Sequence, residues 1–268
     1  MTPRDISVAA IQSQLFWEDK EANLHMFGEK IRAISEPLDL LVLPEMFSTG
    51  FSMNPKKLAE QTDGPTLAWM QKQAANLDAV VTGSFIAEEN GKYFNRLLWV
   101  RPDGTFTHYD KRHLFRMAGE EKIYTAGEKK IIVDLHGWKV CPLVCYDLRF
   151  PVWSRNRWTN AEEGLVADYD LLIYVANWPE RRVKAWNTLL MARAMENVSF
   201  VIGVNRIGND GNNIFHSGDS ALLDFKGDSL KNAVISRDEI ISEKLSYQLL
   251  MEYRKSFPAG MDADAFSI

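Results

Sequence analysis

The chain has 268 residues, of which 46% are hydrophobic and 25% charged, and its formal net charge is −5. This composition is typical of an ordinary globular protein and excludes disordered and fibrous classes. The acidic balance argues against a nucleic-acid partner, because phosphate binding depends on clustered lysine and arginine side chains, and here these are scattered.

Strands and helices are predicted to alternate along the chain, from the spacing of the apolar residues. The predicted strands lie at 6–11, 38–43, 79–86, 96–100, 105–109, 138–144, 169–176, 199–204 and 220–225. The predicted helices lie at 18–35, 66–77, 181–196 and 246–255. Hairpin turns are expected at Pro102-Asp103-Gly104 and at Lys226-Gly227. This order predicts an α/β protein with mixed sheets, as one domain over residues 1–268 with a tail from about 258 that lies across the surface or a partner.

One apolar strand ends in a cysteine at 145, and the residues that follow it predict a sharp turn and a helix with Pro151 in its first turn. This is the layout of a nucleophile elbow, in which the side chain stands clear of the sheet and backbone N–H groups face the developing charge. Taken alone, Cys145 would more often be a small buried core residue.

Two other predicted strands also end beside charged residues, Glu45 and Lys111. Ligands of α/β sheets gather outside the carboxyl ends of the strands. A carboxylate, an ammonium and a thiol brought together there could carry out acyl transfer, with Glu45 as the base and Lys111 as the oxyanion partner. Each residue alone fits a structural role, as a surface charge or part of a solvated run.

Other cysteine chemistry is less consistent with the sequence. His113 could pair with Cys145, but that pairing would leave Glu45 and Lys111 without roles, so His113 is interpreted as a turn residue. Cys141 precedes Cys145 on the same strand and is interpreted as core, since two cysteines form only half of a zinc site.

Three segments resemble the signatures of the nitrilase (carbon–nitrogen hydrolase) superfamily, and they occur in that family's order. They are Leu-Pro-Glu-Met-Phe (43–47), Asp-Lys-Arg-His-Leu-Phe (110–115) and Leu-Val-Cys-Tyr-Asp-Leu-Arg-Phe-Pro (143–151). The resemblance extends through the element order from residue 6 to about 225. Three motifs at compatible spacing are far more specific than one.

The resemblance implies a four-layer αββα sandwich with mixed sheets and a catalytic triad of Glu45, Lys111 and Cys145. It also implies an accessory catalytic glutamate, for which Glu120 is expected and adjacent Glu121 is the alternative. Members of the family pair through helices near the site, so a homodimer is expected to bury residues 150–158 and the helix 181–196.

Within the superfamily the sequence is similar to the ω-amidases, which hydrolyse the terminal amide of small dicarboxylic acid monoamides such as 2-oxoglutaramate. The similarity lies in segments 112–120 and 176–182. Phe115, Tyr146 and Trp178 are expected to bind the substrate, and Phe47 is a further candidate. The candidate anchors for the substrate carboxylate are Arg116, Arg149, Arg181 and Arg182, although Arg149 is expected to pair with Asp147.

Neither a metal ion nor an organic cofactor is expected, and the partner is a small amide. The two cysteines, the lack of a signal sequence and the lack of a membrane-spanning apolar run predict a cytoplasmic protein. The alternatives are another activity of the superfamily, namely nitrile hydrolysis, carbamoyl-amine hydrolysis or acyl transfer, or a non-catalytic relative that binds a nitrogen metabolite.

Overall fold

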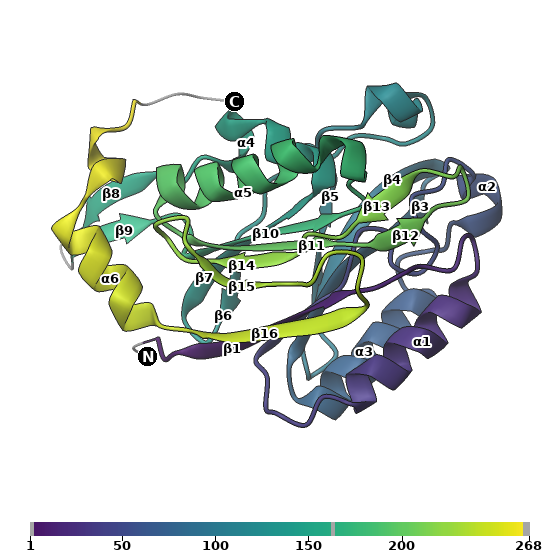
Figure 1. Cartoon of the computed structure of the whole chain (residues 1–268), viewed down its shortest axis with the longest axis horizontal. Helices are drawn as coiled ribbons and strands as arrows, with labels where there is room; N and C mark the ends of the chain where they lie inside the picture. The colour runs from purple at the N-terminus through teal and green to yellow at the C-terminus, as the bar shows by residue number, and fades with distance from the viewer. Residues whose placement is uncertain (1–2, 162–163, 265–268) are drawn as a thin grey trace.

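The computed structural model describes residues 3–161 and 164–264. Two six-stranded mixed sheets pack against each other, and helices cover both outer faces (Figure 1). This arrangement confirms the predicted αββα sandwich.

The first sheet has the strand order β16-β1-β2-β3-β4-β5. Its strands are β1 (Ile6–Gln12), β2 (Leu40–Val42), β3 (Val80–Glu89), β4 (Lys92–Val100), β5 (Phe106–Asp110) and β16 (Glu239–Leu245). The three strands β1, β2 and β3 are parallel, and the other pairings are antiparallel.

The second sheet has the order β15-β14-β11-β10-β7-β6. Its strands are β6 (Val133–Leu135), β7 (Trp138–Val144), β10 (Leu171–Ala176), β11 (Phe200–Asn205), β14 (Ala221–Leu223) and β15 (Ser229–Asn232). The strands β7, β10 and β11 form its parallel centre. Two separate hairpins pair β8 (Trp158–Ala161) with β9 (Gly164–Ala167), and β12 (Ile207–Asn209) with β13 (Phe215–Ser217).

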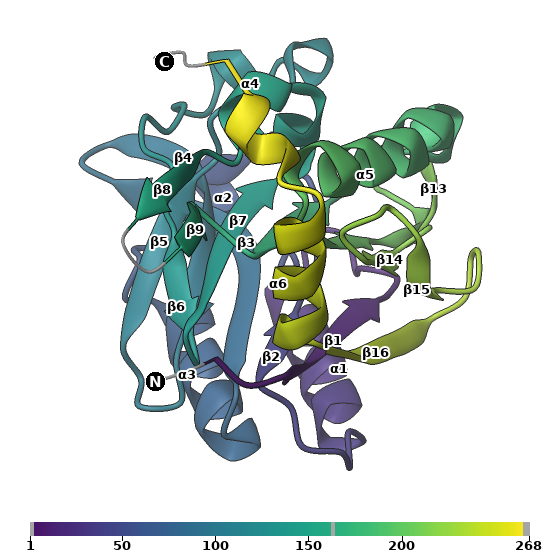
Figure 2. The same ribbon diagram turned by 90° about the vertical axis from the view of Figure 1, so that its left-hand side faces the viewer.

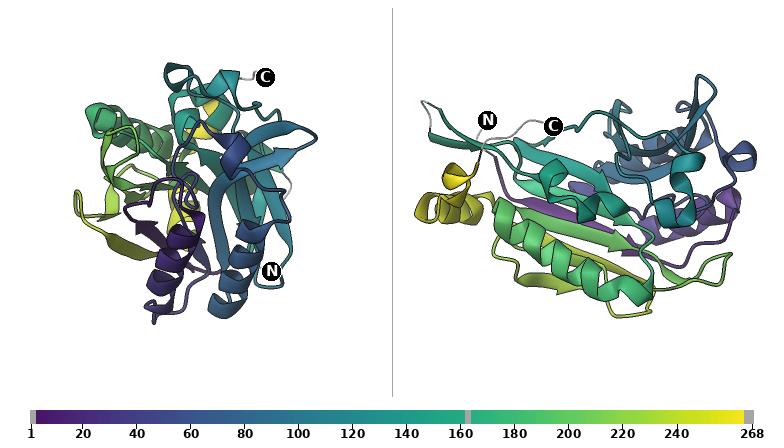
Figure 3. Two further views of the ribbon diagram at one scale, coloured as in Figure 1. Left: turned by 90° about the vertical axis from the view of Figure 1, so that its right-hand side faces the viewer. Right: turned by 90° about the horizontal axis from the view of Figure 1, so that it is seen from above.

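Helices α1 (Lys20–Arg32) and α3 (Pro65–Leu77) lie side by side on the outer face of the first sheet, and α5 (Val183–Asn197) lies on that of the second (Figure 3). Helix α6 (Tyr247–Ser256) lies at one end of the molecule, near β9 (Figure 2). The short helices α2 (Pro55–Leu58) and α4 (Pro151–Ser154) belong to connecting loops.

The alternation of side chains along β1 shows how the layers are joined. Ile6, Val8 and Ala10 belong to the core between the two sheets, whereas Ala9 and Ile11 belong to the core under α1 and α3. Successive strand residues point to opposite faces, so an apolar strand can serve both cores. On β11, a Cβ added at Gly203 would lie 2.5 Å from Leu190 of α5, so glycine permits the close approach of helix and sheet.

The predicted strands and helices are all present, with shifted ends. The hairpin at Gly104 and the one at Gly227 are present, but the longest hairpin, β3–β4, turns at Asn90 and Gly91 and was not predicted. Both turn residues have positive φ, as the tight turns of hairpins require.

The first described part of the expected tail lies across the surface of the protein. Ala259–Asp262 forms a 3-10 turn, and Gly260 is buried against Trp158, where an added Cβ would lie 2.2 Å from the indole ring. This glycine contact fixes the segment on the protein. The expected tail also includes residues 265–268, which lie outside the described residues. Over the part of the chain that is described, no helix is both long enough and apolar enough to cross a membrane.

Candidate active site

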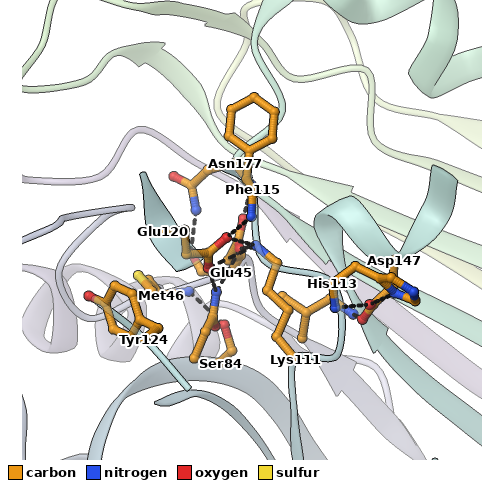
Figure 4. A network of polar contacts seen from close by, with 12 residues as sticks. Glu45, Met46, Ser84, Lys111, His113, Phe115, Glu120, Tyr124, Asp147 and Asn177 are labelled. Carbon is orange, nitrogen blue, oxygen red and sulfur yellow. Dashed lines mark hydrogen bonds and ion pairs between the residues drawn. The ribbon is translucent and has the colours of Figure 1, made fainter. Parts of the chain in front are cut away.

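The loops that follow β2, β5, β7 and β10 bring Glu45, Lys111, Cys145 and Asn177 to one place (Figure 4 shows three of them). The rule that strand ends present functional side chains therefore holds across both sheets of this molecule. All four side chains are almost completely buried.

Glu45 is held by a strained turn. Met46, the next residue, has a φ of 43°, and its N–H donates to the Ser84 hydroxyl at 2.8 Å. A positive φ is uncommon outside glycine, and it persists where surrounding contacts compensate for it. The turn directs the Glu45 carboxylate back toward the second sheet.

Lys111, Asn95 and Asn177 all donate to the Glu45 carboxylate. Its Oε1 accepts from Lys111 Nζ at 2.9 Å and from Asn95 Nδ2 at 2.8 Å, and its Oε2 accepts from the Asn177 N–H at 2.8 Å. The Asn177 amide also donates to the Glu45 carbonyl at 2.5 Å. These bonds satisfy a buried charge that would otherwise be costly.

Lys111 lies between two carboxylates. Its Nζ is 2.9 Å from Glu45 Oε1 and 2.9 Å from Glu120 Oε2, and it lies 5.0 Å from the centre of the Phe51 ring. Burial lowers the pKa of Lys111, but Glu120 and Glu45 together raise it above its usual value. The side chain is therefore a permanent ammonium at neutral pH.

Glu120 rather than Glu121 contacts Lys111. Its Oε2 also accepts the Phe115 N–H at 2.5 Å, which ties this glutamate to the loop before it. Burial, opposed by Lys111 and reinforced by Glu45, raises the pKa of Glu120. Glu121 instead lies 3.9 Å from Arg116, away from the ammonium.

Cys145 is the first residue of a 3-10 turn, Cys145–Arg149, and has a φ of 45°. The predicted elbow is therefore present, and Pro151 begins α4 directly after it. Burial, the charge of Glu45 and a hydrogen bond to Glu45 raise the pKa of the Cys145 thiol, whereas Lys111 and the Asn177 N–H lower it. The thiol therefore needs a base, and Glu45 is the carboxylate beside it.

A cavity of about 530 Å³ opens above Cys145. Phe115, Tyr146 and Trp178 all line it, and the rings of Phe115 and Tyr146 meet edge to face at 5.1 Å. Phe47, the fourth aromatic candidate, is wrong as a pocket residue, because it packs on Phe27 in the core under α1.

Arg149, Arg181 and Arg182 line the same cavity, whereas Arg116 does not. The expected pairing of Arg149 with Asp147 is wrong, because Asp147 bonds to Tyr109 and His113 while the Arg149 guanidinium lies 5.0 Å from the Trp178 ring centre. Arg182 lies 5.0 Å from the ring centre of Phe115.

Two carboxylates, Glu18 and Asp210, also line the cavity, but they bond to Lys57 and to backbone N–H groups rather than to these three arginines. In the described ranges, no carboxylate pairs with any of the three. Burial and the nearby charges of Arg181 and Arg149 lower the pKa of Arg182. The wall is thus prepared to receive an anion.

His113 does not approach Cys145. Its ring stacks on Phe150 at 3.8 Å and its Nδ1 lies 2.8 Å from Asp147, as a structural turn residue would. Cys141 is fully buried in the core between the sheets. Among the residues with described positions, no group of three or more histidine, cysteine or acidic side chains could hold a metal ion.

Sequence reasoning missed the two asparagines that hold Glu45. Asn177 follows β10 directly, so the strand-end rule would have found it. Asn95 lies within β4, where a buried amide in an apolar strand is the only signal.

A buried thiol, an ammonium and two carboxylates beside a cavity, on an αββα sandwich, define an acyl-transfer type of site. The family model for carbon-nitrogen hydrolases matches residues 7–255. The chain belongs to the carbon–nitrogen hydrolase family.

Individual relatives agree over nearly the whole chain. The chain is 43% identical to omega-amidase YafV of Escherichia coli strain K12, covering 98% of each chain. It is 30% identical to 2-oxoglutaramate amidase of Bacillus subtilis strain 168, covering 96% of each. Among solved structures it is similar to XC1258 of Xanthomonas campestris, a CN-hydrolase superfamily protein with an arsenic adduct in its active site. That match has a TM-score of 0.94 and 43% identity, covering 98% of this chain and 99% of the other.

Proposed function

We propose that this protein is an amide hydrolase that cleaves the terminal amide of short dicarboxylic acid monoamides, of the 2-oxoglutaramate and 2-oxosuccinamate type. The products are the dicarboxylic acid and ammonia. The observation that carries the proposal is one cavity with Cys145, Glu45 and Lys111 at its base and, on its wall, arginines that pair with no carboxylate of the described residues. The relatives named as ω-amidase and 2-oxoglutaramate amidase support the same substrate class.

In the proposed acylation, Glu45 accepts the thiol proton of Cys145 while the sulfur attacks the amide carbonyl carbon. The carbonyl electrons move to oxygen, and the Lys111 ammonium with the Tyr146 N–H stabilises this oxyanion. As the intermediate collapses, protonated Glu45 gives its proton to the nitrogen and ammonia leaves. A thioester then remains on Cys145.

In the proposed deacylation, Glu45 takes a proton from water and the hydroxide attacks the thioester carbon. The C–S bond breaks and the proton on Glu45 returns to the sulfur, which releases the acid and restores the enzyme. Glu120 holds the Lys111 ammonium in place in both steps, since it contributes the second carboxylate of that ion pair.

The distal carboxylate of the substrate is proposed to bind Arg149, with Arg182 and Arg181 nearby. A charged wall that lacks its counterion gains most from an anionic ligand. Phe115, Tyr146 and Trp178 are proposed to pack against the short carbon chain.

We also propose that residues 1–268 form a single catalytic domain. Two copies of the chain are proposed to form a homodimer, and the protein is proposed to act in the cytoplasm. β16 from late in the chain pairs with β1, and this supports a single unit. Both cysteines are free, in keeping with a reducing compartment. Exposed apolar residues on α4 and α5 support the dimer.

Ammonia release from a panel of substrates tests the activity. Wild type and Cys145→Ala would be given 2-oxoglutaramate, 2-oxosuccinamate, glutamine, an N-carbamoyl amino acid and an aliphatic nitrile. We expect wild type to prefer the two oxo-acid amides and the variant to lose at least about 1,000-fold in kcat, as removal of a nucleophile does. A thioester on wild-type Cys145 should be trapped by mass spectrometry after rapid acid quench.

A preference for another panel member would replace the substrate proposal and leave the nucleophile in place. Full turnover by Cys145→Ala would overturn the mechanism. Thermal unfolding of the variant provides the control that its fold is intact.

A further inference from the structure

Asp147 is a buried carboxylate two residues after the proposed nucleophile, and the mechanism above gives it no role. It lies beside His113, to the right of Lys111 in Figure 4. No cation neutralises it within the chain as described, apart from the ring of His113 if protonated.

Four donors surround this carboxylate. Its Oδ2 accepts from the Tyr109 hydroxyl at 2.7 Å and from the Val144 N–H at 3.0 Å. Its Oδ1 accepts from the His113 N–H at 3.0 Å and lies 2.8 Å from His113 Nδ1.

The donors come from two separate segments. Tyr109 and His113 lie on either side of Lys111, whereas Val144 directly precedes Cys145. The link is reinforced because Tyr109 OH also accepts from Trp153 Nε1 at 3.0 Å and from the Arg112 N–H at 3.2 Å. Burial, followed by the charge of Asp147, raises the pKa of Tyr109 well above its usual value, so the phenol remains a donor.

We infer that Asp147 is a positioning residue that fixes Lys111 relative to Cys145 by joining the lysine loop to the elbow. The strained φ of Cys145 supports this role, since a left-handed turn needs contacts that hold it. Among the described residues, the ion pairs of Lys111 are with Glu45 and Glu120. Without Asp147, the residues on either side of Lys111 would lose their hydrogen bonds to the elbow. The inference rests on the proposed roles of Lys111 and Cys145.

Asp147→Asn and Tyr109→Phe test the inference. The first keeps the size of the side chain but places an NH₂ group against donors, and the second removes one donor and keeps the ring. Asp170→Asn is the matched control. Asp170 is also a buried aspartate, which accepts from the Lys139 N–H and pairs with Arg254, but it precedes β10 and lies at the strand end opposite to Asn177.

Three quantities would be measured for each variant: kcat and KM on the preferred amide, the pH midpoint of Cys145 alkylation by iodoacetamide, and the melting temperature. For Asp147→Asn we expect kcat to fall about 100-fold with KM unchanged, because displacement of a catalytic group by about 1 Å has that effect. Tyr109→Phe should lose about tenfold in kcat, the worth of one hydrogen bond to a charged group.

In Tyr109→Phe, which keeps the charge of Asp147, the alkylation midpoint should move to higher pH, because the ammonium that stabilises the thiolate is no longer held beside it. In Asp147→Asn the loss of a nearby negative charge opposes this shift, so the upward shift should be smaller. Asp170→Asn should lower the melting temperature and leave kcat and the midpoint at wild-type values.

Wild-type kcat and midpoint in both site variants would overturn the inference. So would an equal loss of kcat in Asp170→Asn at a matched melting temperature, which would make the effect one of general stability. A midpoint that moved to lower pH in Tyr109→Phe would also contradict it, because that variant keeps the Asp147 charge and the result would indicate an opened elbow rather than a released lysine. Alkylation needs no substrate, so it remains decisive even if the proposed amides are not hydrolysed.

Discussion

The charged residues around the cavity fall into two groups, one at its base and one on its wall. At its base, the Lys111 ammonium lies between the carboxyl groups of Glu45 and Glu120, beside the Cys145 thiol. On its wall, Arg149, Arg181 and Arg182 carry positive charge that no carboxylate of the described residues neutralises in an ion pair. An amide with a distal carboxylate matches this polarity in one orientation only, with its amide toward Cys145.

Arg149→Gln should separate binding from chemistry. We expect KM for 2-oxoglutaramate to rise about 10- to 100-fold, the loss of one charge-assisted contact, while turnover of a neutral amide of similar length is unchanged. Initial-rate kinetics on both substrates would measure this. Arg116→Gln is the control, since Arg116 has a side chain that is 82% exposed and lies outside the cavity. An equal loss on the neutral amide would argue against Arg149 as the carboxylate anchor.

The sequence could predict the residues that follow strands, because a strand end is a local feature. Glu45, Lys111 and Cys145 were found in this way, and the structure brings them together. Asn95 and Asp147 could not be assigned, because their partners are 50 and 38 residues distant in the chain and only tertiary contacts reveal them. Arg149 was misassigned because nearness in sequence suggested a pair that the turn does not form.

Among the elements, the β12–β13 hairpin forms part of the cavity wall and contains a buried histidine. His216 on β13 is 2% exposed, and its Nδ1 lies 3.3 Å from the Gly208 carbonyl of β12. Burial, and then the nearby Arg206, lower the pKa of His216 to about 4. The folded protein therefore holds this ring neutral at pH values where the unfolded chain would protonate it.

This histidine should make the protein acid-sensitive. The pKa of His216 in the folded protein lies below its value of about 6.5 in the unfolded chain. The contribution of His216 to the free energy of unfolding is therefore fully present above pH 6.5, and it falls by about 3 kcal/mol as the pH is lowered toward 4. Urea unfolding at pH 7 and pH 4 should show a smaller acid loss for His216→Gln than for wild type. His25→Gln, at an exposed position on α1, should behave like wild type. Identical acid losses in wild type and His216→Gln would contradict the assignment.

Elements whose apolar residues follow a clear helical or strand pattern were predicted. Elements that mix apolar and charged residues without such a pattern were missed. α3 and β10 have apolar residues at regular spacing. β16 reads Glu-Ile-Ile-Ser-Glu-Lys-Leu and is only partly buried, because it is an edge strand with one partner in the sheet. The position of β16 in the sheet depends on its pairing with β1. The local sequence pattern of β16 does not encode this distant pairing.

At the scale of the whole molecule, exposed apolar side chains gather on the helices above the second sheet. Met195 of α5 is 58% exposed, and Met191 of α5 and Val152 of α4 are also exposed. This is the face on which the sequence predicts a partner subunit. Apolar surface of this kind is stabilised when a second copy covers it.

Light scattering should give a mass of twice the 30.6 kDa of the chain. Met195→Asp should shift the protein toward the monomer, because a charge buried in an interface is costly. Leu249→Asp, at an equally exposed apolar position on α6, should leave the dimer intact. A monomeric wild type, or dissociation by Leu249→Asp alone, would refute this placement of the interface.

The pairing of β1 with β16 also bears on how the chain reaches its native state. Residues 6–12 are made long before their antiparallel partner at 239–245. During most of synthesis one side of β1 has no strand beside it, and such an open edge can pair with other nascent chains. Closing this pair requires contacts of very long sequence separation, which is a slow step. Completion of the first sheet therefore waits until β16 has been made.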